Sequence, residues 1–280
     1  IGSNSKTFTV TAILMLADQG KLRLDDPIDR FVEGVPSGNQ ITLRQLAAMR
    51  SGLYNYSDDT NPKLPQQPFR QWTPRELLEI GFRYPLLFPP GSDFDYSNTN
   101  TVLLGVVVEK VSGQSLASFI EQNILKPEGM TRTVFPAGAE FPSPHAQGYF
   151  KLPDGTVVDA TDWNPSWGWA SGSMISTLDD MRVWARDLAI GKLLSPAMKR
   201  ERDQFLPAPA EGEGALYGLA IENQNGWIGH NGNIMSYMAY PYHLPAEGIT
   251  RVALLNSGVK VHGTGIMMQD ITRIINPNHQ

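Results

Sequence analysis

The sequence contains no cysteine, which excludes disulfide bonds, thiolate metal ligands and a cysteine nucleophile. Charged residues make up only 18% of the 280 residues, and the formal net charge is -5. Without an excess of Lys and Arg there is no broad basic surface for a phosphate backbone, so nucleic acid is not an expected partner. The longest apolar run covers residues 102–108, far short of the roughly 20 residues that a membrane-spanning helix needs, and no membrane span is expected.

Patterns for metal or cofactor binding are also lacking. Apart from His230, the histidines are scattered without the spacing of metal ligands, at His145, His243, His262 and His279. The sequence has no glycine-rich phosphate-binding loop either. We therefore expect neither a metal nor a cofactor.

What the sequence does contain is 41% hydrophobic residues with 26 Gly and 21 Pro, a composition typical of a loop-rich globular protein. The opening stretch has helical periodicity, with Ser3 as a suitable N-cap and Gly20 as a stop. Capping boxes that begin at Thr42 and Thr73 predict two short helices. Further helices are predicted over residues 99–111, 116–124 and 178–190 and after the pair Ser195-Pro196.

The C-terminal part changes to strand-like segments, "LYGLAIE", "GWIGHNG", "MSYMAYPY" and "TRVALLN", followed by a final helix in "GIMMQDITRII". These segments predict a small antiparallel sheet closed by a helix. We therefore predict an α/β (α+β) fold with two lobes: a sheet lobe of residues 1–19 and 161–280, and a mostly helical insertion of residues 20–160. The cleft between the lobes is the expected active site.

Ser3 and Lys6 are spaced so that they can act together. Positions i and i+3 of a helix share a face, so the Lys6 amine can reach the Ser3 hydroxyl. A serine hydroxyl is a poor nucleophile until a base takes its proton, and a lysine whose charge is disfavoured can be that base. The helix N-terminus adds partial positive charge that favours an oxyanion. By itself, however, the pattern favours a helix cap beside a solvated lysine.

Two further pairs of residues carry groups that suit the same chemistry. In "DYSNTN", the phenol of Tyr96 can relay a proton, and the amide of Asn98 can hold Lys6 or a substrate carbonyl. In "GHNGN", His230 precedes Gly232 on a predicted strand, where glycine permits close backbone approach. Taken singly, Tyr96 also fits a core tyrosine and His230 a strand histidine.

Together, in this order, the three pairs resemble the serine β-lactamase and penicillin-binding protein family, in its class C and DD-peptidase branch. The motifs of that family are Ser-x-x-Lys, Tyr-x-Asn and Lys or His-x-Gly. The resemblance runs over nearly the whole chain and is greatest to soluble, exported D-alanyl-D-alanine carboxypeptidases. It includes the segments "DQGKLRLDDPI", "ITLRQLAAMRSGLYNYSDD", "PPGSDFDYSNTN", "EKVSGQS", "HAQGY" and "SWGWASGSMIST".

The resemblance implies an antiparallel sheet flanked by helices plus a mostly helical domain, and an extracytoplasmic location, secreted or periplasmic. Relatives carry an N-terminal helix and the first two sheet strands ahead of the Ser-x-x-Lys helix. Here only Ile1 and Gly2 precede Ser3. We therefore expect that the front segment is cleaved, is absent or is supplied as a separate chain.

The resemblance also implies a role for each motif residue. Ser3 would attack a carbonyl to form an acyl-enzyme, and Lys6 and Tyr96 would share the proton transfers. Asn98 would position Lys6 or the substrate amide, and His230 would keep Tyr96 in its working protonation state.

Substrate contacts are implied in the same way. The backbone N–H groups of Ser3 and Asn233 would form the oxyanion hole. The other substrate-binding residues that the resemblance implies are Trp167, Asn231, Gly232 and Asn233.

The chain departs from the carboxypeptidases at Glu222. Those enzymes hold the free carboxylate of the peptide with an Arg before the third motif, where this chain has Glu222, and no Lys or Arg lies between Arg202 and Arg251. A carboxylate facing the pocket would repel a substrate carboxylate and would attract a substrate amine. We therefore expect Glu222 to bind substrate.

The sequence thus predicts a serine hydrolase that acts through an acyl-enzyme on a small peptide, amide or ester, with β-lactams as further candidates. The leading activities are those of a D-alanyl-D-alanine carboxypeptidase and of a D-amino-acid peptidase or amidase. Two alternatives stay open: a carboxylesterase of the same family, and a penicillin-binding or sensor module that does not turn over.

Overall fold

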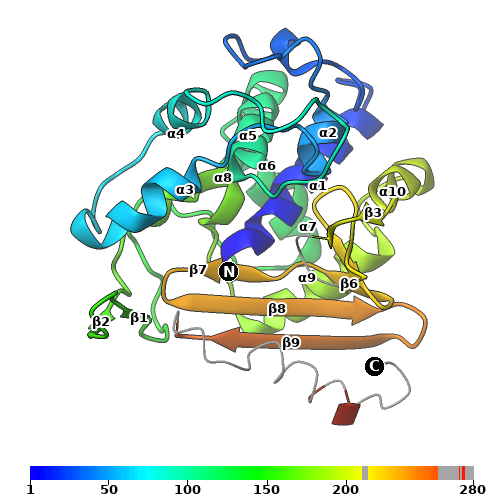
Figure 1. The fold of residues 1–280 in the computed structure, drawn as a ribbon. Coiled ribbons are helices and arrows are strands. Elements are labelled where there is room, and N and C mark those ends of the chain that lie inside the picture. The colour runs from blue at the N-terminus through cyan, green and yellow to red at the C-terminus, as the bar shows by residue number, and fades with distance from the viewer. Residues whose placement is uncertain (210–213, 258–270, 272, 275–280) are drawn as a thin grey trace.

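An antiparallel sheet of seven strands dominates the C-terminal part of the described structure (Figure 1), a computed structural model that describes residues 1–209, 214–257, 271, 273 and 274. The strands follow the order β3-β4-β5-β6-β8-β7, and β9 pairs with the other side of β8. Their bounds are β3 Leu206–Pro207, β4 Leu216–Tyr217, β5 Glu222–Gln224, β6 Trp227–Gly229, β7 Gly232–Ile234, β8 Tyr237–Leu244 and β9 Ile249–Leu255.

β6 and β7 lie along the same side of β8 and are separated by residues 230–231. Gly229 pairs with Tyr242 and Gly232 pairs with Ala239, so the two pairs are three positions apart on both sides of the ladder. The gap therefore interrupts the ladder of hydrogen bonds without shifting its register. The polar groups of residues 230–231 must find partners outside the ladder.

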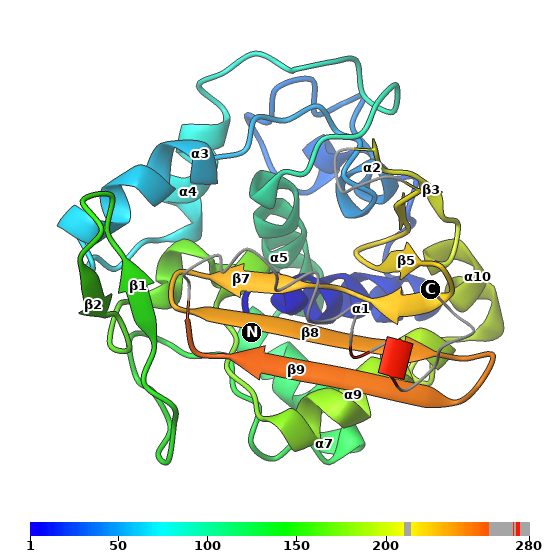
Figure 2. The same ribbon diagram turned by 60° about the horizontal axis from the view of Figure 1, so that its bottom comes forward.

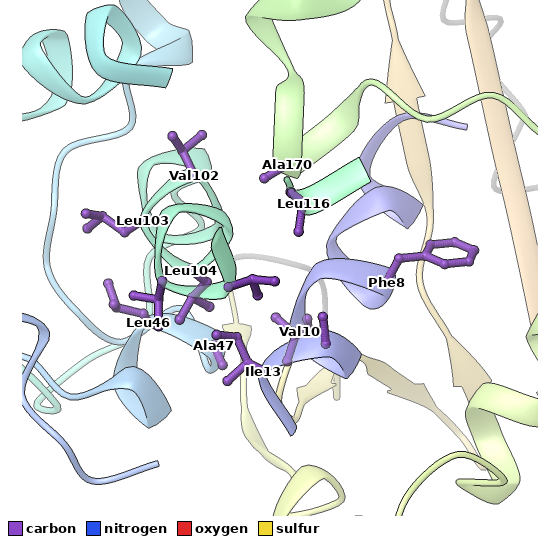
Figure 3. Packing of buried hydrophobic residues seen from close by; sticks show 14 of the residues in the cluster. Phe8, Val10, Ile13, Leu46, Ala47, Val102, Leu103, Leu104, Leu116 and Ala170 are labelled. Atoms are coloured by element: carbon purple, nitrogen blue, oxygen red, sulfur yellow. The ribbon is translucent and has the colours of Figure 1, made fainter. Parts of the chain in front are cut away.

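Two helices form the centre of the hydrophobic core. α1 (Ser5–Asp18) is buried at every position over residues 5–14, as expected for a helix whose small and apolar side chains point in all directions. α5 (Asn98–Ser112) packs against it and ends at Gly113, whose φ of 71° is left-handed. Figure 3 shows Val10 and Ile13 of α1 beside Leu104 of α5. This core holds the start of α1 in a fixed place.

α9 (Leu178–Ile190) packs against β8 and β9. The side chain of Thr177 caps its N-terminus by accepting a hydrogen bond from the backbone N–H of Asp180, and Gly191 ends it with a φ of 72°. The bounds predicted from the sequence for this helix, residues 178–190, are confirmed.

The remaining elements are shorter and connect these layers. The helices are α2 Leu43–Ala47, α3 Ser57–Thr60, α4 Pro74–Gly81, α6 Leu116–Ile120, α7 Lys126–Glu128, α8 Trp169–Gly172 and α10 Pro196–Arg202. The 3₁₀ and π turns are η1 Gly2–Asn4, η2 Ile28–Arg30, η3 Asn61–Gln66, η4 Glu121–Leu125 and η5 Pro165–Trp167. The hairpin of β1 (Tyr149–Lys151) and β2 (Val157–Asp159) lies on the opposite side of the molecule from α10 (Figure 2).

The predicted capping boxes are confirmed, whereas two predictions about helix ends are wrong. The capping boxes at Thr42 and Thr73 are both formed. Ser3 is not the N-cap of α1, because η1 precedes the helix and Asn4 occupies the cap position. The helix predicted over residues 116–124 breaks after Ile120 into a π turn.

Two further predictions, the division into two lobes and the final helix, are not tested by the described residues. The division into a sheet lobe and a helical lobe stays a prediction, although residues 20–160 also hold the β1–β2 hairpin. The predicted final helix, residues 265–275, lies largely outside the described residues.

Within the described residues, no single helix is long and apolar enough to cross a membrane. One bent pair, Asn98–Ser112 with Leu116–Glu128, passes the same test of length and composition when taken together, with an angle of 77° between its halves.

Candidate active site

Ser3 lies in a 3₁₀ turn that contacts the outer strand β7. Gly2 has a left-handed φ of 54°, and a Cβ atom there would lie 2.5 Å from the backbone nitrogen of Asn233. A Cβ atom on Gly232 would lie 2.0 Å from the carbonyl oxygen of Ile1. Only glycine fits at both positions. The two glycines therefore allow the backbone around Ser3 to approach that of Asn233, as an oxyanion hole built from both residues would require.

The amine of Lys6 is held in a buried position beside Ser3. Its Nζ atom lies 3.0 Å from Ser3 Oγ and donates a hydrogen bond of 2.8 Å to the backbone oxygen of Ser171. The side chain of Lys6 is fully buried, whereas Ser3 is partly exposed. The arrangement predicted from the spacing, an amine within hydrogen-bonding distance of a serine hydroxyl, is present.

Tyr96 lies on the loop before α5, next to the Lys6 amine. The Nζ atom of Lys6 is 4.8 Å from the centroid of the Tyr96 ring. The same ring makes an edge contact with Tyr217, at 6.4 Å between centroids and 88° between planes, and lies 6.1 Å from the ring of His230. The fold thus brings the predicted residues Lys6, Tyr96 and His230 together and adds Tyr217 to them.

His230 is held in one tautomer by two hydrogen bonds. Its Nδ1 atom is 2.6 Å from the carbonyl oxygen of Asn231, and its Nε2 atom is 2.9 Å from the hydroxyl of Tyr217. A carbonyl oxygen can only accept, so Nδ1 carries the proton, and Nε2 accepts the hydroxyl proton of Tyr217. Both ring nitrogens are therefore engaged, and His230 reaches Tyr96 by ring contact and through Tyr217.

The neutral state of His230 predicts a loss of stability in acid. Burial, and Lys6 in its protonated form, lower the pKa of His230 to about 3, against about 6.5 in the unfolded chain. Between these values the unfolded chain binds more protons, so the free energy of unfolding should fall with decreasing pH, by up to about 1.4 kcal/mol per pH unit. Urea unfolding across this range measures the slope.

The matched variant for this measurement is His230→Gln, which has no group that titrates there. Its unfolding free energy should depend less steeply on pH than that of the wild type. His243, whose pKa burial also lowers, is present in both proteins and contributes equally. Equal slopes in the two proteins would contradict the assignment.

Asn98 begins α5 and is tied to the neighbouring loop. Its side-chain amide donates to the hydroxyl of Ser57 at 3.0 Å, and its backbone N–H donates to Asn55 Oδ1 at 3.0 Å. These bonds fix the orientation of its side chain. The role expected for Asn98, positioning Lys6 or a substrate amide, stays a prediction.

Glu222 does not face an open pocket. Its side chain is buried, and its carboxylate accepts hydrogen bonds from Tyr242 at 2.5 Å, from Gln224 at 2.8 Å and from the side-chain amide of Asn231 at 3.1 Å. Burial raises the pKa of Glu222, while these hydrogen bonds act in the opposite direction. A carboxylate enclosed in this way is not accessible to a substrate amine, which corrects the expected role of Glu222.

The other predicted substrate residues of this region lie at the start of β7. Gly232 is buried, Asn231 is partly exposed and Asn233 is exposed. Within the described sheet, β7 pairs only with β8, so its free side lies toward the turn that holds Ser3. An extended substrate could pair with this strand.

Trp167, which is predicted to bind substrate, is 9% exposed and belongs mainly to the core. It also borders a cavity of about 600 Å³, together with Trp163 and Met235. Neither Ser3 nor Lys6 lines this cavity, which therefore lies beside the Ser3 site and not over it. Neither here nor elsewhere in the described chain do three His, Asp or Glu side chains lie together as a metal ion would require.

Two residues of the site were not predicted. Ser171 contributes a backbone oxygen to Lys6, and a backbone atom leaves no signal in the side-chain pattern. Tyr217 lies in the strand-like segment "LYGLAIE", and no role was predicted for it. Its hydrogen bond to His230 depends on a turn over residues 218–221, and the spacing of the two residues does not reveal it.

Comparison with known proteins adds three findings. The sequence pattern of the Beta-lactamase family matches residues 1–265. "Protein flp" of Staphylococcus aureus (strain MRSA252) is 28% identical over 267 residues, which are 92% of this chain and 52% of the relative. The chain spans about half the length of the curated relatives it matches.

Two solved structures are similar over nearly the whole chain. A D-stereospecific amidohydrolase from Streptomyces sp. has a TM-score of 0.90 at 29% identity, covering 99% of this chain and 86% of its own. A D-amino acid amidase from Ochrobactrum anthropi SV3, complexed with L-phenylalanine amide, has a TM-score of 0.86 at 26% identity, covering 98% of this chain and 82% of its own.

Proposed function

The chain belongs to the Beta-lactamase family of serine hydrolases, and we propose that it cleaves the amide bond of D-amino-acid amides or short D-peptides through an acyl-enzyme on Ser3. The observation that carries the proposal is the 3.0 Å contact between Ser3 Oγ and Nζ of the buried Lys6. The names of two similar structures, a D-stereospecific amidohydrolase and a D-amino acid amidase, support the choice of an amide substrate.

The first step is attack by Ser3. With Lys6 as the neutral amine, Nζ takes the hydroxyl proton while the oxygen forms a bond to the substrate carbonyl carbon. The hydrogen bond from Lys6 to Ser171 helps to keep the lone pair of Nζ directed at Ser3. The carbonyl π electrons move to oxygen, and the backbone N–H groups of Ser3 and Asn233 stabilise the oxyanion.

The second step expels the amine. As the carbon–nitrogen bond breaks, the leaving nitrogen takes a proton from the Tyr96 hydroxyl, and Tyr96 recovers a proton from the Lys6 ammonium. The products of this half-reaction are an ester on Ser3, free ammonia or amine, and neutral Lys6. Water then attacks the ester carbonyl carbon. As the new carbon–oxygen bond forms, Tyr96 takes a proton from the water and passes its own to Lys6; as the bond to Ser3 breaks, the Lys6 ammonium returns a proton to Ser3 Oγ.

Charges near the site favour a substrate with an amine over one with a free carboxylate. Asp95 precedes Tyr96 in the chain, and burial and the nearby charge of Asp58 raise the pKa of Asp95. Carboxylates that repel one another in this way are relieved by a bound cation. Over residues 203–250 the sequence has no Lys or Arg to hold a carboxylate. We infer that these carboxylates, and not Glu222, attract the substrate amine.

A panel of four substrates tests the proposal: D-phenylalanine amide, an acyl-D-Ala-D-Ala peptide, a p-nitrophenyl ester and a β-lactam. We expect kcat/KM for the D-amide to exceed that for acyl-D-Ala-D-Ala at least about tenfold, the effect of about 1.4 kcal/mol of charge discrimination. L-phenylalanine amide is the matched control and should be cleaved at least about tenfold more slowly. Ammonia and D-Ala release give the rates.

Each other outcome points to a different activity. Release of D-Ala at the rate of the amide, or faster, would contradict the charge argument. Turnover of the ester alone would make the protein an esterase. A stable β-lactam adduct without turnover of any substrate would make it a penicillin-binding or sensor module.

A further inference from the structure

The carboxylate of Glu222, the first residue of β5, is buried next to His230. Glu222 accepts four hydrogen bonds, and all four come from neutral donors: the hydroxyl of Tyr242, the amide of Gln224, and both the side-chain amide and the backbone N–H of Asn231. An ionised carboxylate can only accept hydrogen bonds, so this set of donors matches the charged form. The site therefore includes a buried negative charge on Glu222, which makes no hydrogen bond to Ser3.

This charge lies next to His230. The Oε1 atom of Glu222 is 3.4 Å from His230 Nδ1, the atom whose proton is donated to the carbonyl oxygen of Asn231 at 2.6 Å. If the proton moved to Nε2, the lone pair of Nδ1 would face both the carboxylate and the carbonyl oxygen. Glu222 thus favours the Nδ1–H tautomer by its charge, and it also holds Asn231 in place.

The tautomer determines what the other side of the ring can do. With Nε2 free of a proton, His230 accepts the hydroxyl of Tyr217 at 2.9 Å. The ring of Tyr217 makes the edge contact with Tyr96, and the rings of His230 and Tyr217 are themselves 5.6 Å apart. A continuous set of contacts therefore runs from Glu222 to the tyrosine beside Lys6.

We propose that Glu222 is a positioning residue. It fixes the tautomer of His230 and the conformation of residues 230–231 in the gap between β6 and β7. Through His230 and Tyr217 it also fixes the orientation of the Tyr96 ring. The same gap leads directly into Asn233, whose N–H is assigned to the oxyanion hole. The effect of Glu222 on the reaction rate rests on the proposed function, whereas its effect on the tautomer does not.

Glu222→Gln tests the proposal, because it keeps the shape of the side chain and removes the charge. Long-range ¹H–¹⁵N NMR distinguishes a protonated from an unprotonated ring nitrogen. We expect the wild type to show a proton on Nδ1 of His230 and the variant to show a mixture of tautomers. On the amide substrate, kcat should fall about tenfold while KM changes less than about twofold, since positioning acts on the reacting geometry.

Tyr242→Phe is the matched control. It removes one hydrogen bond to the same carboxylate in the same buried layer, and the hydroxyl that is lost bonds to Glu222 and Gln224 and not to His230. It should keep the Nδ1–H tautomer and should keep kcat within about twofold. Equal losses in both variants would indicate a general effect of disturbing the sheet and would overturn the proposal.

Tyr217→Phe covers the case in which Glu222→Gln does not fold. It keeps the ring that contacts Tyr96 and removes only the hydroxyl that His230 binds. Because Glu222 and Asn231 remain, His230 should keep its proton on Nδ1, whereas kcat should fall about tenfold; an unchanged kcat would overturn the proposal. A wild-type His230 protonated on Nε2, or a tautomer shift without a change in kcat, would overturn the proposal. If the wild type turns over no substrate while the tautomers shift as expected, the proposed function fails and the link from Glu222 to His230 stands.

Discussion

Replacing Ser3 by alanine should abolish turnover of every substrate that the wild type hydrolyses, with kcat lowered by about 10⁴-fold or more. Removing the attacking oxygen eliminates the acyl-enzyme path altogether, and loss of a nucleophilic serine has effects of this order in serine hydrolases. Substrate binding should change little, because the backbone N–H groups assigned to the oxyanion hole remain. Initial rates on the preferred substrate of the panel measure the effect.

Ser5→Ala is the matched control, two residues along the same segment. Ser5 is buried, and its hydroxyl accepts a hydrogen bond of 3.1 Å from the backbone nitrogen of Met174. Its loss should cost about 1 kcal/mol of stability and leave activity within a few-fold of the wild type. Intact mass and peptide mapping after treatment with a fluorophosphonate should place the adduct on Ser3 in the wild type and in Ser5→Ala. Labelling at another residue, or turnover by Ser3→Ala, would refute the assignment.

Features that depend on a few neighbouring residues could be predicted from the sequence. The capping boxes at Thr42 and Thr73 form because each involves residues only three positions apart. The end of α9 follows from Gly191, which alone among its neighbours adopts the left-handed conformation at no cost. The proximity of Ser3 and Lys6 is local in the same sense, because one turn of the chain sets it.

Features that depend on contacts between residues distant in sequence could not be predicted in this way. Ser3 is not a helix cap, because a 3₁₀ turn places the backbone of Gly2 against β7, more than 200 residues away. Whether Glu222 faces the pocket or the interior depends on the register of its strand, because a shift of one residue moves each side chain to the opposite face of the sheet. The sequence around Glu222 does not determine that register. The contact of Tyr217 with His230 requires the turn over residues 218–221, where Ala220 has a φ of 54°. These are the places where motif spacing gave no answer or the wrong one.

The second large effect is expected for Lys6→Met, which keeps the length and burial of the side chain and removes the amine. If Lys6 is the base for Ser3, acylation should slow by about 10² to 10⁴-fold, the usual contribution of a positioned general base. The rate of β-lactam or fluorophosphonate labelling measures acylation directly, since product release plays no part in it. Hydrolysis of the amide should fall by at least as much, because Lys6 also acts in deacylation.

The loss of a hydrogen bond between α1 and α8 must be separated from the loss of the base. Lys6 donates to the backbone oxygen of Ser171, and one turn later Thr9 donates to that of Ala170, both at 2.8 Å. Thr9→Val removes the second bond and leaves the amine in place, so it should weaken packing without slowing acylation more than a few-fold. If Thr9→Val lost as much activity as Lys6→Met, the effect would come from the packing of the two helices. If Lys6→Met acylated within about tenfold of the wild-type rate, the base would have to be another group, and Tyr96, whose ring lies 4.8 Å from the Lys6 amine, would be the next to replace.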